Sequence, residues 1–311
     1  MEPILQIEHL SITFTQYSRG ARRREMPVIR DLSLSLSPGE VTAVVGASGS
    51  GKSLLAHAIL GLLPYNSRRE GSILYKGQEL TPRRLEKLRG REISLVPQGV
   101  TYLDPLMKVG PQLTQGRRDI DTRRRAREAL SRYGLGPGTE RLYPFQLSGG
   151  MARRVLMASA VMESPQLIIA DEPTPGLDAQ AAGRLLGHFR ELAQEGAAVL
   201  FITHDLELAL TVAHRVAVFY AGETIEEALA SDFEAGSLRH PFTKALWDAL
   251  PQRGFRPIPG SQPYPGEVGE GCPFLGQCPH PGAGCAQGPL PLRPFQGGAV
   301  RCLYPNKEVA P

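Results

Sequence analysis

The segment GASGSGKS, at residues 46–53, fits the pattern G-x-x-x-x-G-K-[ST] of phosphate-binding loops. In this pattern, glycine-rich backbone wraps the phosphates, the lysine (Lys52) reaches the β and γ phosphates, and the hydroxyl of Ser53 ligates Mg²⁺. The segment follows an apolar run and opens an apolar helical pattern, a context that favours a phosphate site over a chance glycine-rich turn. The sequence therefore predicts a binding site for a magnesium nucleotide. Its predicted residues are Gly46, Ala47, Ser48, Gly49, Ser50, Gly51, Lys52, Ser53 and Leu54.

Two carboxylates end the apolar run LIIADEP at residues 167–173. We expect Asp171 to hold Mg²⁺ through water, and Glu172 to orient or deprotonate the water that attacks the γ-phosphate. Acidic pairs often simply end strands at the surface. The presence of Lys52 about 120 residues upstream favours the catalytic interpretation.

Two further polar side chains follow apolar runs, and each could act at the same edge of a parallel sheet. His204, in FITHD, is a candidate contact of the γ-phosphate that holds the water in line, although a lone histidine is usually a packing or surface residue. Gln98, after REISLVP, is a candidate sensor of Mg²⁺ and of the attacking water.

A second anion-binding turn, Ser148-Gly149-Gly150, precedes a helix-forming run. Backbone N–H groups at a helix start lack intrahelical partners and favour negative charge. Because the chain already has a phosphate-binding loop, we expect this turn to complete the site of a second chain. Two chains paired head to tail would then be joined by ATP and loosened by its hydrolysis.

The elements that must position these residues follow an α/β pattern. Residues 41–45, 166–171 and 197–203 are expected strands, while 52–63 and 179–196 are expected helices. A strand, a glycine-rich turn and a helix in succession indicate a largely parallel sheet. Between about 106 and 163, arginine-rich helical patterns replace the strand signals.

Composition limits the class of protein. The chain has 311 residues with a net charge of +4, and its apolar runs are of strand length, far short of a membrane span or signal peptide. All four cysteines lie in the last 40 residues, so no disulfide framework is expected in the body of a cytosolic protein. The arginine-rich run at 117–127 has no interleaved aromatic residues, which favours a solvated face over nucleic-acid or lipid contact.

Together, these motifs resemble those of the ATP-binding cassette (ABC) ATPases. The matching segments are, in order, GASGSGKS, Gln98, LSGGM, LIIADEP, GLD at 176–178 and THD at 203–205. The resemblance implies a P-loop NTPase of class α/β, with a RecA-like core, an antiparallel β layer and a helical subdomain. It also implies that Phe14, or Tyr17, stacks on adenine and that Asp178 links two sites across a dimer.

The segments LYPFQLSGGM, GKSL and RHPFTKALWDALP resemble the ATPase subunits of dipeptide, oligopeptide and nickel importers. We therefore expect an ATPase domain at 1–238, with its helical subdomain at about 99–163, and a C-terminal extension at 239–311. The implied partners are a second, identical or similar ATPase, two membrane permeases and a solute-binding protein, at the cytoplasmic face of the plasma membrane. No nucleic-acid partner is expected.

The extension carries Cys272, Cys278, Cys285 and Cys302, with 5, 6 and 16 residues between successive cysteines. Four thiolates in a reducing compartment favour metal or cluster ligation over disulfides. The resemblance implies a [4Fe–4S] cluster, found in some members. A structural zinc site and a tail that binds no metal are the alternatives.

Two other functional classes fit less well. A soluble ABC-type ATPase acting on ribosomes or DNA usually carries two cassettes, a long coiled coil or large insertions, and this chain has none of these. A GTPase switch would leave LSGGM unexplained, and the sequence has no N-K-x-D base-recognition motif. Pro175 should stiffen the approach to Asp178, but it does not alter the predicted catalytic residues, so we expect a competent ATPase.

Overall fold

A computed structural model describes residues 2–17, 23–47, 49–258, 260–264 and 266–305. Five strands form a parallel sheet in the order β9, β3, β8, β7, β6. Their bounds are β3 (Val41–Gly46), β6 (Ile93–Val96), β7 (Leu167–Asp171), β8 (Ala198–Thr203) and β9 (Arg215–Tyr220). The strands predicted at 41–45, 166–171 and 197–203 are confirmed.

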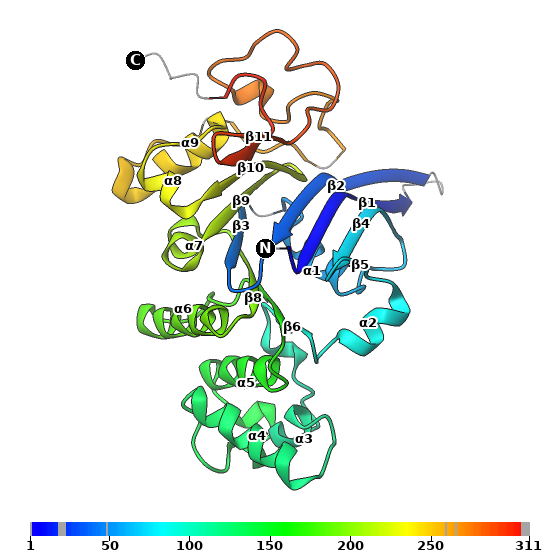
Figure 1. Cartoon of the computed structure of the whole chain (residues 1–311), viewed down its shortest axis with the longest axis vertical. Coiled ribbons are helices and arrows are strands. Elements are labelled where there is room, and N and C mark those ends of the chain that lie inside the picture. The colour runs from blue at the N-terminus through cyan, green and yellow to red at the C-terminus, as the bar shows by residue number, and fades with distance from the viewer. Residues whose placement is uncertain (1, 18–22, 48, 259, 265, 306–311) are drawn as a thin grey trace.

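The parallel sheet is buried on both faces because alternate side chains enter two cores. In β8, Val199 and Phe201 join one core, and Leu200 and Ile202 join the other. Helices α6 (Ala179–Gln194) and α7 (Leu206–Val212) cover the first face, and α1 (Lys52–Ile59) covers the second (Figure 1). Apolar strands of this kind are typical of parallel sheets covered by helices.

An antiparallel layer extends the sheet. It consists of β1 (Leu5–Tyr17), β2 (Arg23–Leu36), β4 (Ser67–Tyr75) and β5 (Gln78–Glu79), with α2 (Pro82–Leu88) following in the chain. Strand β10 (Glu223–Leu229) joins the two parts, since it pairs with β9 and, at Glu223, with Asp31 of β2. This layer agrees with the predicted fold class.

The arginine-rich region is helical, as its pattern predicted. It contains α3 (Val109–Leu113), α4 (Ile120–Arg132) and α5 (Gly149–Val161), which pack together at one end of the molecule (Figure 1). Short 3₁₀ helices lie at Val100–Tyr102, Thr139–Arg141, Pro144–Gln146, Pro251–Arg253 and Leu275–Gln277.

The C-terminal extension lies at the opposite end and packs directly on the first hydrophobic core (Figure 1). The extension follows α8 (Ala230–Glu234) in the chain. Its helix and strands are α9 (Pro241–Asp248), β11 (Arg293–Phe295) and β12 (Gly298–Val300). Strand β12 pairs with β10, and Phe242 and Phe274 join the main core. The domain boundary at residue 238 stays a prediction. Arg239, the first residue of the predicted extension, is buried against Glu226 of β10, so packing continues across that position.

Strand β10 was not predicted from the sequence, because ETIEEAL has little strand character. The fold buries its acidic side chains by pairing them with arginines: Glu226 with Arg239, and Glu227 with Arg215. In the described residues, no helix is long and apolar enough to cross a membrane.

Candidate active site

The P-loop, residues 46–53, connects β3 to α1 at the carboxyl end of the parallel sheet. A Cβ on Gly46 would lie 2.4 Å from the carbonyl oxygen of Phe219, so only glycine fits there. Gly51 caps α1 with φ of 97°, a left-handed conformation that glycine adopts without strain. Ser48 lies outside the described residues.

Lys52 is buried at the centre of this loop. Its Nζ donates hydrogen bonds to the carbonyl oxygens of Gly46, at 2.7 Å, and Ala47, at 2.9 Å. Burial lowers the pKa of Lys52, while the carboxylates of Glu172 and Asp171 act in the opposite direction. The ammonium group is therefore held by the backbone of the loop, and it interacts electrostatically with both Glu172 and Asp171.

The two predicted magnesium ligands from distant segments lie together. Ser53 Oγ donates a hydrogen bond of 3.1 Å to Asp171 Oδ1, which joins the start of α1 to the end of β7. Burial raises the pKa of Asp171, and the hydrogen bond from Ser53 opposes that shift. A hydroxyl and a carboxylate are oxygen donors suited to Mg²⁺.

Glu172 adopts a strained backbone conformation. Its φ is 46°, which is unusual for a residue with a side chain, and its N–H donates to the carbonyl oxygen of Ile202 at 2.9 Å. Strain of this kind concentrates at functional sites, where it aims a side chain.

His204 lies against this carboxylate, with Nδ1 at 2.7 Å from Oε2 and 2.9 Å from Oε1 of Glu172. An ionised carboxylate only accepts hydrogen bonds, so Nδ1 carries the proton in this pair. The pair couples the ends of β7 and β8, as expected for residues at one edge of a parallel sheet.

A cavity that we call the nucleotide cavity joins these segments. Its lining residues are Val28, Gly49, Gly51, Lys52, Ser53, Leu54, Gln98 and Glu172. Seven of these were predicted from the P-loop, the carboxylate and the glutamine motifs. Val28 was not predicted, and Phe14 was expected near the base. Phe14 lies on β1, half-buried against the second core, and does not line this cavity, while Tyr17 is exposed.

The predicted dimer residues lie outside the nucleotide cavity. Ser148 caps α5, accepting a hydrogen bond from Met151 N at 3.2 Å, and Asp178 caps α6, accepting one from Ala181 N at 2.8 Å. Ser148, Gly149, Gly150 and Asp178 are all exposed. Their predicted role at a partner's nucleotide stays a prediction.

Arg153 connects α5 to the nucleotide cavity, and this residue was not predicted from the sequence. Its Nη1 donates to the carbonyl oxygen of Pro173 at 2.6 Å, and its Nη2 donates to that of Gln98 at 3.3 Å. The helix that follows Ser148 is therefore tied to the segment after Glu172 and to the predicted magnesium sensor. The available sequence signal was a cation one helical turn into that helix.

The four cysteines of the extension line one small cavity beside two histidines, His240 and His280. None of the four forms a disulfide. Burial raises the pKa of Cys272 to about 12 and raises that of Cys302. No group of three or more histidine, cysteine or acidic side chains in the described ranges is arranged to hold a metal ion.

Comparison with known proteins identifies two matching families. Residues 29–175 match the family described as ABC transporter, and residues 225–285 match the oligopeptide/dipeptide transporter C-terminal region. The second match covers most of β10, all of α9 and the first three cysteines.

Individual relatives match over nearly the whole chain. The chain is 34% identical to the oligopeptide transport ATP-binding protein OppD of Escherichia coli (strain K12), over 99% of this chain and 95% of that protein. It is 36% identical to the dipeptide transport ATP-binding protein DppD of Bacillus subtilis (strain 168), over 90% and 88%.

A solved structure shares the fold. The dimeric post-hydrolysis structure of the ATP-binding cassette MJ0796, bound to ADP and Pi, aligns with a TM-score of 0.63 and 27% identity. The alignment covers 73% of this chain and 98% of that one. The shared part therefore accounts for most of the chain outside the extension.

Proposed function

The chain belongs to the ATP-binding proteins of ABC transporters, and from that premise we propose that it energises an importer of peptides. Members of this family hydrolyse ATP to energise transport. The proposal of a peptide cargo is supported by the oligopeptide and dipeptide transporters named among its relatives. Nickel or a nickel chelate, the other cargo expected from the sequence, has no such support.

The observation that carries the catalytic proposal is the convergence of Lys52, Ser53, Asp171, Glu172 and His204 at one sheet edge. With MgATP as substrate, Lys52 neutralises the β and γ phosphates, while Ser53 and Asp171 hold Mg²⁺. Gln98 lines the same cavity and would contact the metal and the water.

Glu172 then orients the attacking water and accepts its proton. The Nδ1–H of His204 holds the Glu172 carboxylate in place, which aligns the base before ATP arrives. Once the γ-phosphate is bound, His204 turns to contact it. These steps use only groups that already surround one cavity or its rim.

The proposed assembly is a head-to-tail pair of ATPase chains on two membrane permeases, supplied by a solute-binding protein. The exposed Ser148-Gly149-Gly150 turn supports the pairing, because it lies outside its own chain's nucleotide cavity. Such a complex works at the cytoplasmic face of the plasma membrane. The alternative, a soluble ATPase acting on ribosomes or DNA, leaves the transporter-type extension without a role.

The catalytic proposal is tested by the substitution Glu172→Gln, which keeps size and polarity but removes the base. We expect ATP turnover to fall by about a hundredfold or more while ATP still binds. Turnover and bound ATP would be measured by phosphate release and by nucleotide recovered after gel filtration.

The matched control is Glu86→Gln, on the exposed face of α2, which removes the same charge far from the nucleotide cavity. It should leave turnover unchanged. Wild-type turnover in the Glu172→Gln protein would exclude Glu172 as the base.

We also propose that the four extension cysteines bind a [4Fe–4S] cluster, with structural zinc as the alternative. Thiolates are the usual cluster ligands, and all four side chains line one cavity. Their present arrangement is not that of a metal site, so ligation requires the thiols to draw together. A cluster held there would supply one-electron redox chemistry or a structural clamp.

The measurement is iron, acid-labile sulfide and zinc content, with visible absorbance, after anaerobic purification. Iron and sulfide in equal amounts are expected. Zinc alone would support the alternative, and the absence of both metals would refute metal binding by the extension.

A further inference from the structure

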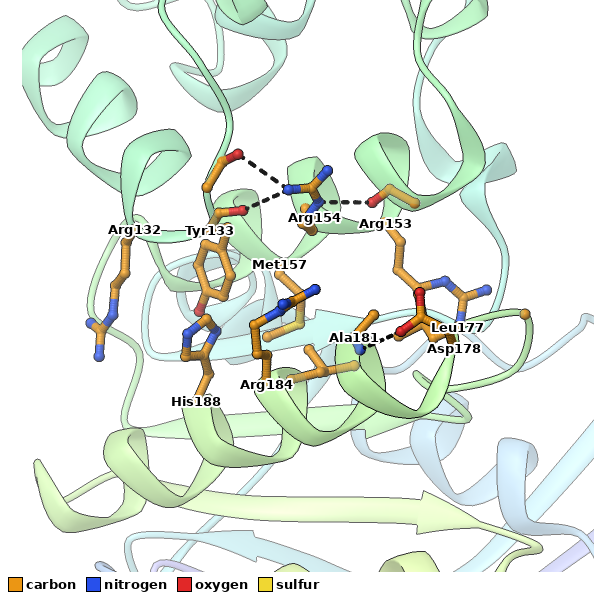
Figure 2. Close-up of a pocket in the computed structure, with 14 residues that line it drawn as sticks. Arg132, Tyr133, Arg153, Arg154, Met157, Leu177, Asp178, Ala181, Arg184 and His188 are labelled. Atoms are coloured by element: carbon orange, nitrogen blue, oxygen red, sulfur yellow. Dashed lines mark hydrogen bonds between the residues drawn. The ribbon is translucent and has the colours of Figure 1, made fainter.

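A second cavity, of about 720 Å³, lies between the helical region and α6 (Figure 2). We call it the arginine cavity. It extends from Arg132 and His188 at one end to Asp178 at the other (Figure 2). Sites for small molecules commonly have volumes of roughly 300–1,000 Å³. None of the residues of the nucleotide cavity lines this one.

Three of the four arginines in the described lining have no carboxylate partner. Arg154 donates only to backbone carbonyls, those of Tyr133, Gly134 and Gly150 (Figure 2). Arg153 likewise donates to the carbonyls of Pro173 and Gln98. Neither guanidinium therefore has a counterion within the described part of the chain.

Arg184 extends from α6 into the same space (Figure 2). Across the described residues it makes no hydrogen bond or ion pair. The fourth arginine, Arg132, is already paired with Glu191 and Glu195. Asp178 is the one acidic residue among the described residues of the lining, so the cavity has a net positive charge.

Two buried polar atoms of the described residues, at the end of the cavity near Arg132, have no hydrogen-bond partner. They are Tyr133 Oη and His188 Nδ1. Tyr133 is 4% exposed, and its ring meets that of His188 edge-on at 4.8 Å between centroids. Burial raises the pKa of Tyr133 to about 12 and lowers that of His188, so at neutral pH one is a hydroxyl donor and the other a neutral imidazole. Buried polar groups in proteins are almost always satisfied, and an unpaired one is costly.

We propose that the arginine cavity binds a small phosphorylated anion, contacted by Arg184, Arg153 and Arg154 and by the hydroxyl of Tyr133. Guanidinium groups bind phosphate through paired, charge-assisted hydrogen bonds, and a phosphate has enough oxygens to contact more than one guanidinium at once. A small molecule fits better than a macromolecule because the cavity lies between packed helices rather than on a flat face.

A ligand in this cavity would connect α5 with α6. Arg153 already ties α5 to Gln98 and Pro173, so occupancy would be transmitted to Gln98 in the nucleotide cavity and to the segment after Glu172. The site is thus placed to regulate hydrolysis in response to a metabolite, without sharing a residue with the nucleotide cavity.

The test is calorimetric titration of the full chain with pyrophosphate while excess MgADP occupies the P-loop. One pyrophosphate per chain is expected. Arg184→Gln should weaken binding by about tenfold or more, because it removes a charged donor. Tyr133→Phe should weaken it about threefold or more without lowering the melting temperature, since its hydroxyl has no partner in the protein.

The control Arg83→Gln removes the same charge from an exposed position on α2 and should bind as the wild type does. The proposal is overturned if saturable binding is absent, or if Arg184→Gln binds as tightly as the wild type. Pyrophosphate that binds only when MgADP is omitted occupies the P-loop and also overturns it. None of these outcomes depends on the turnover of Glu172→Gln, so the two proposals fail separately.

Discussion

Burial determines the charge of His240, the N-cap residue of α9. Its side chain is 1% exposed, and Nδ1 accepts a hydrogen bond from Phe242 N at 3.0 Å. Burial, with a smaller contribution from the charge of Arg301, lowers its pKa from 6.5 to about 3. His240 is therefore neutral in the folded protein at pH values where the same side chain in the unfolded chain would begin to protonate.

This pKa shift makes stability depend on pH. Below about pH 6.5 the unfolded chain binds a proton at His240 that the folded chain does not, so stability falls as pH decreases towards 3. Between about pH 7.5 and pH 5, this residue should lower the free energy of unfolding by about 2 kcal/mol. His240→Asn keeps an acceptor for Phe242 N and removes the titration, so its stability should fall less over that range.

The measurement is the free energy of unfolding by urea at both pH values for the wild type and His240→Asn. Equal pH dependence in the two proteins would show that His240 protonates while folded. Other titrating groups are common to both proteins and cancel in the comparison.

Helices α4, α5 and α6 each begin at a side-chain cap, and this matters for interpreting Ser148. Its hydroxyl caps α5 within its own chain, besides the role proposed at a partner's nucleotide. Ser148→Ala would cost about 1 kcal/mol of helix stability and so mix the two roles. Aspartate caps as well as serine does, but its charge would repel a phosphate. Ser148→Asp is therefore the variant that separates capping from nucleotide contact.

The whole assembly can be tested by mixing two defective chains. Lys52→Ala removes the phosphate contact of the P-loop but leaves the Ser148 turn of the same chain intact. Ser148→Asp disables the turn but leaves the P-loop of the same chain intact. Each alone should hydrolyse ATP poorly. In a head-to-tail pair of one Lys52→Ala and one Ser148→Asp chain, one of the two sites receives an intact P-loop and an intact turn.

Mixing the two proteins should therefore restore a substantial part of the wild-type turnover, increasing with protein concentration as pairs form. The control mixture is Lys52→Ala with Glu172→Gln, where both defects fall on the P-loop side and no intact site arises. Equal activity in both mixtures, or full activity of Ser148→Asp alone, would exclude a site shared between chains.

The sequence by itself determined the parts whose chemistry is local. A P-loop needs only consecutive backbone and one lysine, so GASGSGKS identified the loop, its preceding strand and its helix. Asp171, Glu172, His204 and Gln98 could be predicted to lie together, because each ends or follows a parallel strand and these strands share one edge. The α/β class and the helical region followed from the same periodicities.

Only the tertiary structure decided the features made by residues far apart in the chain. Strand β10 is polar in sequence and is buried because arginines from distant segments pair with its glutamates. Arg153 contacts the segments after β6 and β7, and the arginine cavity forms where α4 and α5 meet α6. The physical reason is that long-range pairing of charges and the shape of a cavity depend on packing, which no local sequence pattern encodes.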